Sequence, residues 1–245
     1  MLRIVVFSGG SIDLMTRYGA DPKKIVWIPH GVDLSLNPAP LPAPDDGVFT
    51  VTYLGAHNQW NSLDAVLDAA RILQNDGVKN VLLRFVGDGE SKPALVARAK
   101  AEAIHNVRFD NPVPKTQVPA IKHQSDAFII NNRRDKVSSN WMSFNKIYDY
   151  LAAGRPVVFG SCSQEDPVRE ANAGISVHAD DARMLAQAIA LLARQSPEQL
   201  RAYGLRGRAF IEKNYSIPSL AQRFEATAEA CIAEISSGAE SNVTY

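Results

Sequence analysis

Residues 145–158 read Asn145-Lys146-Ile147-Tyr148-Asp149-Tyr150-Leu151-Ala152-Ala153-Gly154-Arg155-Pro156-Val157-Val158 and join a helix to a strand. The periodicity predicts a helix over 145–153, with Ile147, Leu151 and Tyr148 as candidates for its packed side. Gly154 ends this helix, because glycine readily takes the left-handed conformation that terminates helices. Pro156 then starts a strand, since an apolar run follows it.

The same alternation of apolar runs and helical periods extends in both directions from this stretch. Strands are predicted at residues 2–7, 24–28, 49–54, 81–86, 107–109, 127–130, 156–159 and 175–177. Helices are predicted at residues 63–73, 91–103, 118–122, 145–153, 184–192, 197–214 and 218–235, with Asn61 or Ser62 capping the first and Asp180 or Asp181 capping the fifth. The fold class is therefore α/β, a Rossmann-like parallel sheet with helices on both faces. Ligands of such sheets bind beyond the carboxyl ends of the strands, at the switch point.

Composition excludes several classes of protein. The chain has 245 residues, of which 46% are hydrophobic and 21% charged, which is typical of a globular protein. Lys plus Arg and Asp plus Glu both number 26, so nucleic-acid binding through a basic field is not expected. No apolar run approaches the roughly 18 residues that a membrane span needs. Cys162 and Cys231 cannot form a disulfide framework or a tetrahedral zinc site, and a reducing cytoplasm, with both buried as small apolar side chains, fits them.

Two glycine turns follow predicted strands. Gly55 follows the strand at 49–54 and opens a turn that contains His57 and Asn58. A glycine there lets a ligand approach the backbone, and the amides of the next helix suit a phosphate. An ordinary strand-to-helix turn is the alternative explanation of the same residues. The second turn, at Gly87, resembles half of a dinucleotide fingerprint, but its third glycine would fall at Lys92, which disfavours a dehydrogenase.

A long polar loop over residues 132–144 precedes the helix at 145–153. Arg133 lies in this loop and Lys146 in the first helical turn, where a cation opposes the helix dipole. A bound anion would relieve that conflict, and a solvated lysine is the alternative. Asn145 and Asp149 share a helix face. Asp149 can therefore accept hydrogen bonds from a ribose, or can simply face solvent.

The stretch 145–158 resembles the segment K-[LI]-[FY]-E-Y-[LM]-A-A-G-[KR]-P-V of family 4 retaining glycosyltransferases. Other stretches resemble motifs of that family in the same order: I-P-H-G-V-D at 28–33 resembles I-P-N-G-V-D, Y-L-G at 53–55 resembles Y-x-G, F-V-G-D-G at 85–89 resembles L-V-G-D-G, and V-R-F-D-N-P-V-P at 107–114 resembles V-x-F-x-G-x-V-P. The resemblance covers nearly the whole chain and corresponds to the second half of the family. It implies the C-terminal, donor-binding domain of the GT-B fold.

The resemblance also implies a division of the chain. Residues 1–36 would be a remnant of the N-terminal domain with its connecting turn, 37–47 a Pro-rich linker, 48–217 the nucleotide-sugar-binding Rossmann-like domain, 218–235 a C-terminal helix and 236–245 a flexible tail. The acceptor-binding domain would then be missing, and this fragment alone would be inactive in transfer.

The donor site of the family has an E-x7-E pair, and Asp149 occupies the place of the second acid, which implies a contact with the ribose. Trp141 stands in the place of the first acid, with Asn140 or Ser139 as substitutes. The family's Arg and Lys would fall near Ala56 and Asn61, and neither residue is basic.

The predicted nucleotide-sugar-binding residues therefore differ in part from the family pattern. They are Gly55, His57, Asn58, Gly87, Val113, Arg133, Ser143, Phe144, Asn145, Lys146 and Asp149. The diphosphate would be held by the amides of Phe144 and Asn145 with Lys146 and Arg133, and the base would meet the backbone at Val113. The resemblance assigns no catalytic residue, and no metal and no cofactor are expected.

The activity implied is transfer of a sugar, with retention, from a nucleoside diphosphate sugar to an acceptor hydroxyl, with UDP favoured over GDP. The resemblance points to bacterial surface polysaccharide or glycolipid biosynthesis in the cytoplasm, at the inner face of the membrane if the acceptor is lipid-linked. The expected partners are the nucleotide sugar and the missing N-terminal domain, with a peripheral membrane contact also open and no nucleic acid. Two alternatives remain: a non-catalytic nucleotide-sugar-binding module, and a GT-B-type sugar-nucleotide epimerase.

Overall fold

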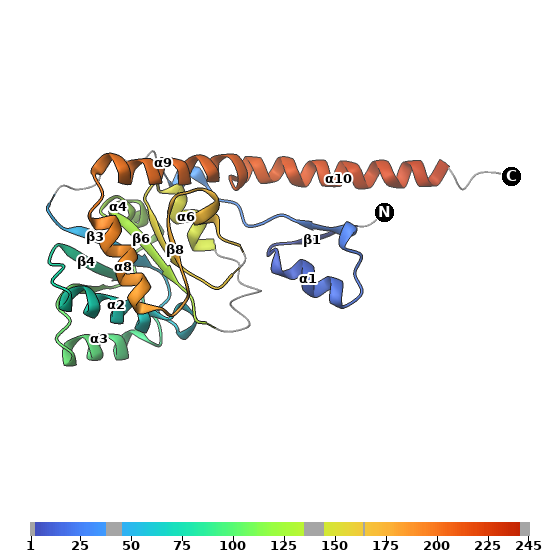
Figure 1. Cartoon of the computed structure of the whole chain (residues 1–245). Helices are drawn as coiled ribbons and strands as arrows, with labels where there is room; N and C mark the ends of the chain where they lie inside the picture. The colour runs from blue at the N-terminus through green and yellow to red at the C-terminus, as the bar shows by residue number, and fades with distance from the viewer. Residues whose placement is uncertain (1–2, 38–45, 135–144, 164, 241–245) are drawn as a thin grey trace.

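The computed structural model describes residues 3–37, 46–134, 145–163 and 165–240, in which strands and helices alternate (Figure 1). The strands are β1 (Ile4–Val6), β2 (Ile25–Trp27), β3 (Phe49–Leu54), β4 (Val81–Val86), β5 (Val107–Asp110), β6 (Ala127–Asn131), β7 (Val157–Gly160) and β8 (Gly174–Val177). The α-helices are α1 (Gly10–Arg17), α2 (Leu63–Asn75), α3 (Lys92–Ala101), α4 (Val118–His123), α6 (Asn145–Ala152), α7 (Pro167–Glu170), α8 (Ala182–Ala193), α9 (Pro197–Asn214) and α10 (Ile217–Glu240). Short 3-10 turns are η1 (Pro22–Lys24), η2 (Leu34–Leu36), η3 (Gln59–Asn61) and η4 (Lys115–Gln117).

The larger sheet has the strand order β5-β4-β3-β6-β7-β8, and all its strand pairs are parallel. The chain runs from β3 outward to β4 and β5, and then returns to place β6 on the other side of β3. The switch point of the sheet therefore lies between β3 and β6. The predicted α/β class with a parallel, helix-covered sheet is confirmed.

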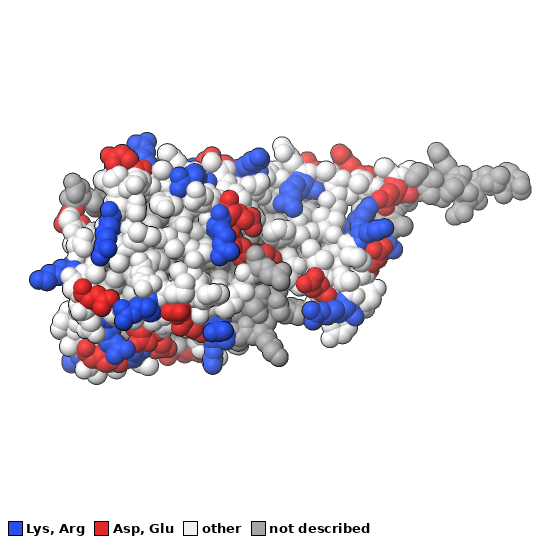
Figure 2. All heavy atoms as spheres, in the orientation of Figure 1, with Lys and Arg blue, Asp and Glu red and all other residues white. Residues whose placement is uncertain are grey.

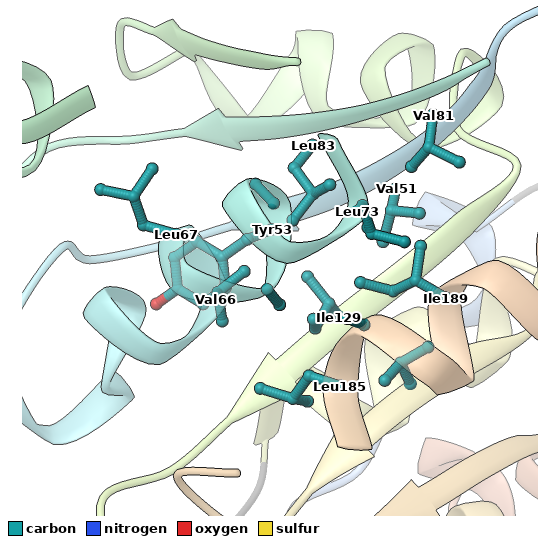
Figure 3. Close-up of a cluster of buried hydrophobic side chains, with 14 of the residues drawn as sticks. Val51, Tyr53, Val66, Leu67, Leu73, Val81, Leu83, Ile129, Leu185 and Ile189 are labelled. Atoms are coloured by element: carbon teal, nitrogen blue, oxygen red, sulfur yellow. The ribbon is translucent and has the colours of Figure 1, made fainter. Parts of the chain in front are cut away.

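Alternate residues of the central strands supply two hydrophobic cores on opposite faces of the sheet. Val51 and Tyr53 of β3 and Ile129 of β6 face the helices α2 and α8, and Figure 3 shows Tyr53 beside Leu67 of α2. Phe128 of β6 belongs to the second core, which packs against α6 and α9. The two cores fix the positions of β3 and β6, and the end of β3 lies next to the helix α6.

Several predicted boundaries coincide with the observed ones, notably those of β3, β4 and α9. Asp181 caps α8 as predicted, accepting a hydrogen bond from the Met184 N–H at 2.9 Å. Ser62 does occupy the position before α2, but its hydroxyl bonds to Asp180 and leaves the helix amides uncapped. Ser62, one of the two predicted capping residues, is therefore confirmed as the N-cap residue of α2, but it takes a left-handed conformation with φ of 39° and makes no side-chain hydrogen bond to the helix.

The N-terminal segment lies apart from the large sheet, where β1 and β2 form a two-stranded parallel sheet beneath α10 (Figure 1). Arg223 of α10 donates to the carbonyl of Trp27 at 2.7 Å, and Arg3 pairs with Glu234. These contacts place α10 along the N-terminal segment rather than along the large sheet.

Two expectations about the chain's ends and thiols need correction. The helix predicted to end at residue 235 continues as α10 to Glu240, so that predicted end is wrong, and residues 241–245 lie outside the described part. Cys162 and Cys231 are free and partly exposed, so the expected burial of both is also wrong.

Basic and acidic side chains lie intermixed on the face that Figure 2 shows. This pattern agrees with the equal numbers of acidic and basic residues in the sequence. Among the described helices, none has the length and apolar content that crossing a membrane requires.

Candidate functional site

The site lies at the switch point, where β3 and β6 separate. The two strands pair only at Val51–Ala127 and Thr52–Phe128. Beyond these pairs, the backbone of Leu54 bonds to the Tyr150 hydroxyl instead, which accepts from the Leu54 N–H at 2.8 Å and donates to the Leu54 carbonyl at 2.9 Å. Tyr150 thereby attaches α6 to the end of β3, and the first turn of α6 comes to lie over the Gly55 turn.

Lys146, in the first turn of α6, points its ammonium into this opening. Its Nζ donates to the Tyr53 hydroxyl at 2.8 Å and to Asn61 Oδ1 at 3.3 Å. Both partners are neutral, and no carboxylate of the described residues forms an ion pair with Lys146. Burial lowers the pKa of Lys146 to about 8. A largely buried cation whose hydrogen-bond partners among the described residues are neutral is a strong local source of positive potential.

Glycines make room for this lysine and for a pocket beside it. A Cβ on Gly55 would lie 2.6 Å from Lys146 Cε, and a Cβ on Gly87 would lie 2.0 Å from the Gly55 carbonyl oxygen. Both glycines have φ in the positive region, at 153° and 142°, which L residues rarely adopt. The turns after β3 and β4 therefore touch each other backbone to backbone.

A pocket of about 320 Å³ opens at these turns. It is lined by Leu54, Gly55, Ala56, Val86, Gly87, Asp88, Pro112, Val113 and Val118. The pocket brings together three of the predicted site residues, Gly55, Gly87 and Val113. Its apolar walls with exposed glycine backbone suit a planar ring that approaches the main chain closely.

His57 and Asn58 are predicted site residues, but neither offers a free side chain to a nucleotide. The His57 ring is fully buried between Tyr53, Phe85 and Phe109, and neither of its nitrogens has a hydrogen-bond partner. A ring without exposed surface cannot touch a nucleotide, so the expectation for the His57 side chain is wrong. Asn58 Oδ1 accepts from the Trp60 N–H and from Asn61 Nδ2, which commits it to the turn η3.

Asp149 lies on the exposed side of α6, and its side chain is 53% exposed. Asn145, four residues earlier, is also exposed, while Ile147 and Leu151 are buried as expected. The carboxylate of Asp149 lies 3.6 Å from the ammonium of Lys122, a residue of α4 whose own side chain is only 8% exposed. The predicted orientation of α6 is thus confirmed, with the acid directed outward.

Other predicted site residues are less well defined. Arg133 is exposed, its N–H donates to the Trp60 carbonyl at 3.0 Å, and its guanidinium approaches Gln59 Oε1 at 3.5 Å. Arg133 therefore lies beside the turn η3, and these contacts do not bring its guanidinium to the Lys146 ammonium, with which it was predicted to hold the diphosphate. Ser143 and Phe144, together with Ser139, Asn140 and Trp141, lie outside the described residues. Among the described residues, no group of three or more His, Cys, Asp or Glu side chains is placed to hold a metal ion.

Sequence reasoning missed three residues of the site: Tyr53, Tyr150 and Lys122. Tyr53 is the last inward-facing residue before Gly55, and Tyr150 is one turn after Lys146. Strand alternation and helix spacing could therefore have predicted that both lie at the site. Lys122 carried no such signal, because a lysine in a short helical segment is ordinarily exposed.

The profile of the family described as Glycosyl transferases group 1 matches residues 48–195. No curated protein matches the sequence. Among solved structures, the fold is similar to a glycosyltransferase from Rickettsia africae (TM-score 0.76, 16% identity, covering 93% of this chain and 63% of that protein).

Two further structures are similar in the same way. HepE of Anabaena, solved in complex with UDP and glucose, gives a TM-score of 0.73 at 15% identity, covering 93% of this chain and 62% of HepE. Sucrose-phosphate synthase of Thermosynechococcus elongatus gives 0.72 at 17% identity, covering 94% and 58%. The architecture therefore matches that of GT-B glycosyltransferase domains, and the chain spans less than two thirds of each of these proteins. Since the matched profile covers more than half of the sequence, the chain belongs to the family Glycosyl transferases group 1.

Proposed function

We propose that this chain is the donor-binding domain of a retaining glycosyltransferase of the family 4 type, and that it holds a nucleoside diphosphate sugar, with UDP as the favoured nucleotide. The observation that carries the proposal is the ammonium of Lys146, a largely buried cation with neutral hydrogen-bond partners at the Gly55 turn. Burying a charge without a counter-charge is costly. A diphosphate at this position supplies the missing negative charge.

The position of the cation supports a diphosphate as the bound anion. The resemblance to family 4 places a basic residue near Asn61, where this chain has none. The Lys146 Nζ lies 3.3 Å from Asn61 Oδ1, so the positive charge reaches that place from α6 instead. Gly55 leaves the backbone beside it open to a ligand.

The rest of the nucleotide fits the neighbouring groups. The pocket at Gly87 and Val113 takes the base, and the exposed carboxylate of Asp149 accepts hydrogen bonds from the ribose. In catalysis, the site contributes by positioning the donor and by stabilising the departing diphosphate through Lys146. HepE of Anabaena, a structural relative, has been solved with UDP-glucose, which supports UDP as the first nucleotide to test.

The acceptor, the retention of configuration and the pathway are part of the same proposal. We assign the acceptor to a second domain, because the relatives are longer than this chain. Bacterial surface polysaccharide or glycolipid synthesis in the cytoplasm is the setting that the resemblance favours.

The proposal is tested by isothermal titration, which measures the affinity for UDP of the original chain and of a Lys146 variant. Lys146→Met is expected to weaken UDP binding by about tenfold to a hundredfold, since it removes charge-assisted hydrogen bonds worth about 1.5–3 kcal/mol. Lys100→Met, at an exposed lysine on α3, is the control and should bind UDP like the original chain. Equal affinity in Lys146→Met would remove the basis of the proposal.

A further inference from the structure

A second lysine, Lys122 of α4, is buried behind the proposed ribose site and takes no part in holding the diphosphate. Its side chain is 8% exposed, and it is the buried member of the pair with Asp149, whose side chain is 53% exposed. The Nζ of Lys122 lies 3.6 Å from Asp149 Oδ1 and 3.4 Å from the main-chain carbonyl of the same residue. Lys122 therefore contacts both the side chain and the backbone of Asp149.

Asn37 fixes the position of the Lys122 ammonium from the other side. Its Oδ1 accepts a hydrogen bond from Lys122 Nζ at 2.7 Å, and Asn37 is only 2% exposed. The carbonyl of Asn37 in turn accepts from Arg208 Nη1 of α9 at 2.7 Å. The ammonium is thus held by Asn37 on one side and by Asp149 on the other.

Burial opposes the charge on Lys122, and its pKa is lowered for that reason, while Asp149 acts in the opposite direction. A buried lysine of this kind is costly to a fold, and a leucine or methionine would pack the same space without that cost. The ion pair is therefore better explained by what it does for the exposed carboxylate than by a contribution to stability.

We propose that Lys122 is a positioning residue that orients the Asp149 carboxylate toward the ribose hydroxyls of the bound nucleotide. Lys122 attracts one oxygen of the carboxylate from behind, and this leaves the other oxygen directed to solvent and to the ligand. Without Lys122, the exposed carboxylate rotates freely and must lose that freedom when a ribose binds. The inference rests on the proposed function, because it needs a nucleotide at Asp149.

The test compares UDP with 2′,3′-dideoxy-UDP, which lacks the hydroxyls that Asp149 would bind. Isothermal titration gives the ratio of the two affinities for the original chain, for Lys122→Met and Lys122→Gln, and for Asp149→Asn. The ratio is expected to be about tenfold or more in the original chain, as two hydrogen bonds to a charged acceptor imply. It should fall to about twofold or less in Asp149→Asn and in both Lys122 variants.

Arg155→Met provides a matched control. Arg155 is also a buried cation, and it donates to the carbonyl of His123, which belongs to α4 like Lys122, at 3.3 Å. It precedes β7 and therefore lies at the amino ends of the strands, whereas the proposed site lies at their carboxyl ends. Its removal should lower stability without changing the ratio. Lys122→Gln keeps a hydrogen-bond donor toward Asn37 and serves if Lys122→Met fails to fold.

The outcomes separate the two proposals. An unchanged ratio in the folded Lys122 variants, with both ligands weakened equally, would make Lys122 structural and overturn the inference alone. Equal binding of both ligands by the original chain would overturn the ribose role of Asp149 and the inference with it, while nucleotide binding stands. Failure of the original chain to bind UDP at all would overturn the proposed function and the inference together.

Discussion

The Nζ atom of Lys146 lies 2.8 Å from the hydroxyl oxygen of Tyr53, and this hydrogen bond joins the first turn of α6 to the end of β3. The Tyr53 hydroxyl donates onward to the Ala56 carbonyl at 2.7 Å, so the lysine is tied to the glycine turn as well as to the strand. The contact spans the switch point of the sheet. It places a positive charge where parallel α/β sheets bind their ligands.

Gly55→Ala is expected to weaken UDP binding by about tenfold, because the new methyl group would lie 2.6–2.7 Å from the end of the Lys146 side chain and displace the ammonium. Isothermal titration measures the effect. Gly77→Ala is the control, since Gly77 also has a positive φ, of 76°, but no atom lies within 4 Å of its added methyl. If both variants bind UDP like the original chain, the Lys146 position is unimportant for the ligand.

UDP binding should weaken as pH rises through about 8, because the pKa of Lys146 in the free protein is lowered to that value by burial. The diphosphate favours the protonated lysine, so binding is strongest where that form prevails, and the phosphates are already ionised above about pH 7. Titrations at pH 7, 8 and 9 check this. Lys146→Arg, which stays charged, should bind with little change over that range, and an equal decline in Lys146→Arg would assign the pH dependence to another group.

His57 should make the fold sensitive to acid. Burial, with a smaller effect of the Lys92 charge, lowers its pKa from 6.5 to about 4. The unfolded chain therefore binds a proton between these values that the folded chain does not, and the free energy of unfolding decreases as pH falls from 6.5 toward 4. Urea unfolding at pH 7 and pH 5 should show this loss reduced by about 1–2 kcal/mol in His57→Leu. His105→Leu, at an exposed site, should keep the full loss, and the same loss in both variants would exclude His57 as the cause.

Two glycines of α9 are predicted to differ in their response to alanine. A Cβ on Gly204 would lie 1.9 Å from the Gly154 carbonyl oxygen, whereas one on Gly207 would lie 3.0 Å from side-chain atoms of Ala173 and Leu151. Backbone cannot move aside as side chains can, so Gly204→Ala should lower the free energy of unfolding by about 2–3 kcal/mol. Gly207→Ala should be near neutral, because the higher helix propensity of alanine, about 1 kcal/mol, offsets the tight contact. Equal effects in thermal unfolding would show that α9 shifts freely over the end of α6.

The sequence predicts the fold well where local signals and packing agree. The apolar runs of β3 and β4 have their observed ends, because turn residues border them, and the Ser196 capping box of α9 with Gln199 fixes the start of that helix. The end of α10 differs from the predicted residue 235, because Ser236, Ser237 and Gly238 are weak helix formers that predict an earlier end, whereas the helix continues to Glu240.

The site could be predicted only in part from the sequence. Glycines after β3 and β4 and the acid of α6 follow from strand ends and helix spacing, and the structure brings Gly55 and Gly87 into one pocket. The burial of His57 depends on three aromatic rings from different strands, and the pairing of Lys122 with Asp149 depends on how α4 packs beside α6. Such contacts come from tertiary packing between distant segments, for which the linear pattern has no signal.

The most direct test of donor binding is a thermal-shift titration of the chain with UDP, GDP and ADP, with Asp149→Ala alongside. A ligand at about 100 times its dissociation constant adds about 2.7 kcal/mol, which raises the melting temperature of a chain of this size by roughly 5–10 °C. The account predicts such a shift with UDP, smaller shifts with GDP and ADP, and a reduced UDP shift in Asp149→Ala. No shift with any of the three nucleotides, or an undiminished UDP shift in Asp149→Ala, would contradict it.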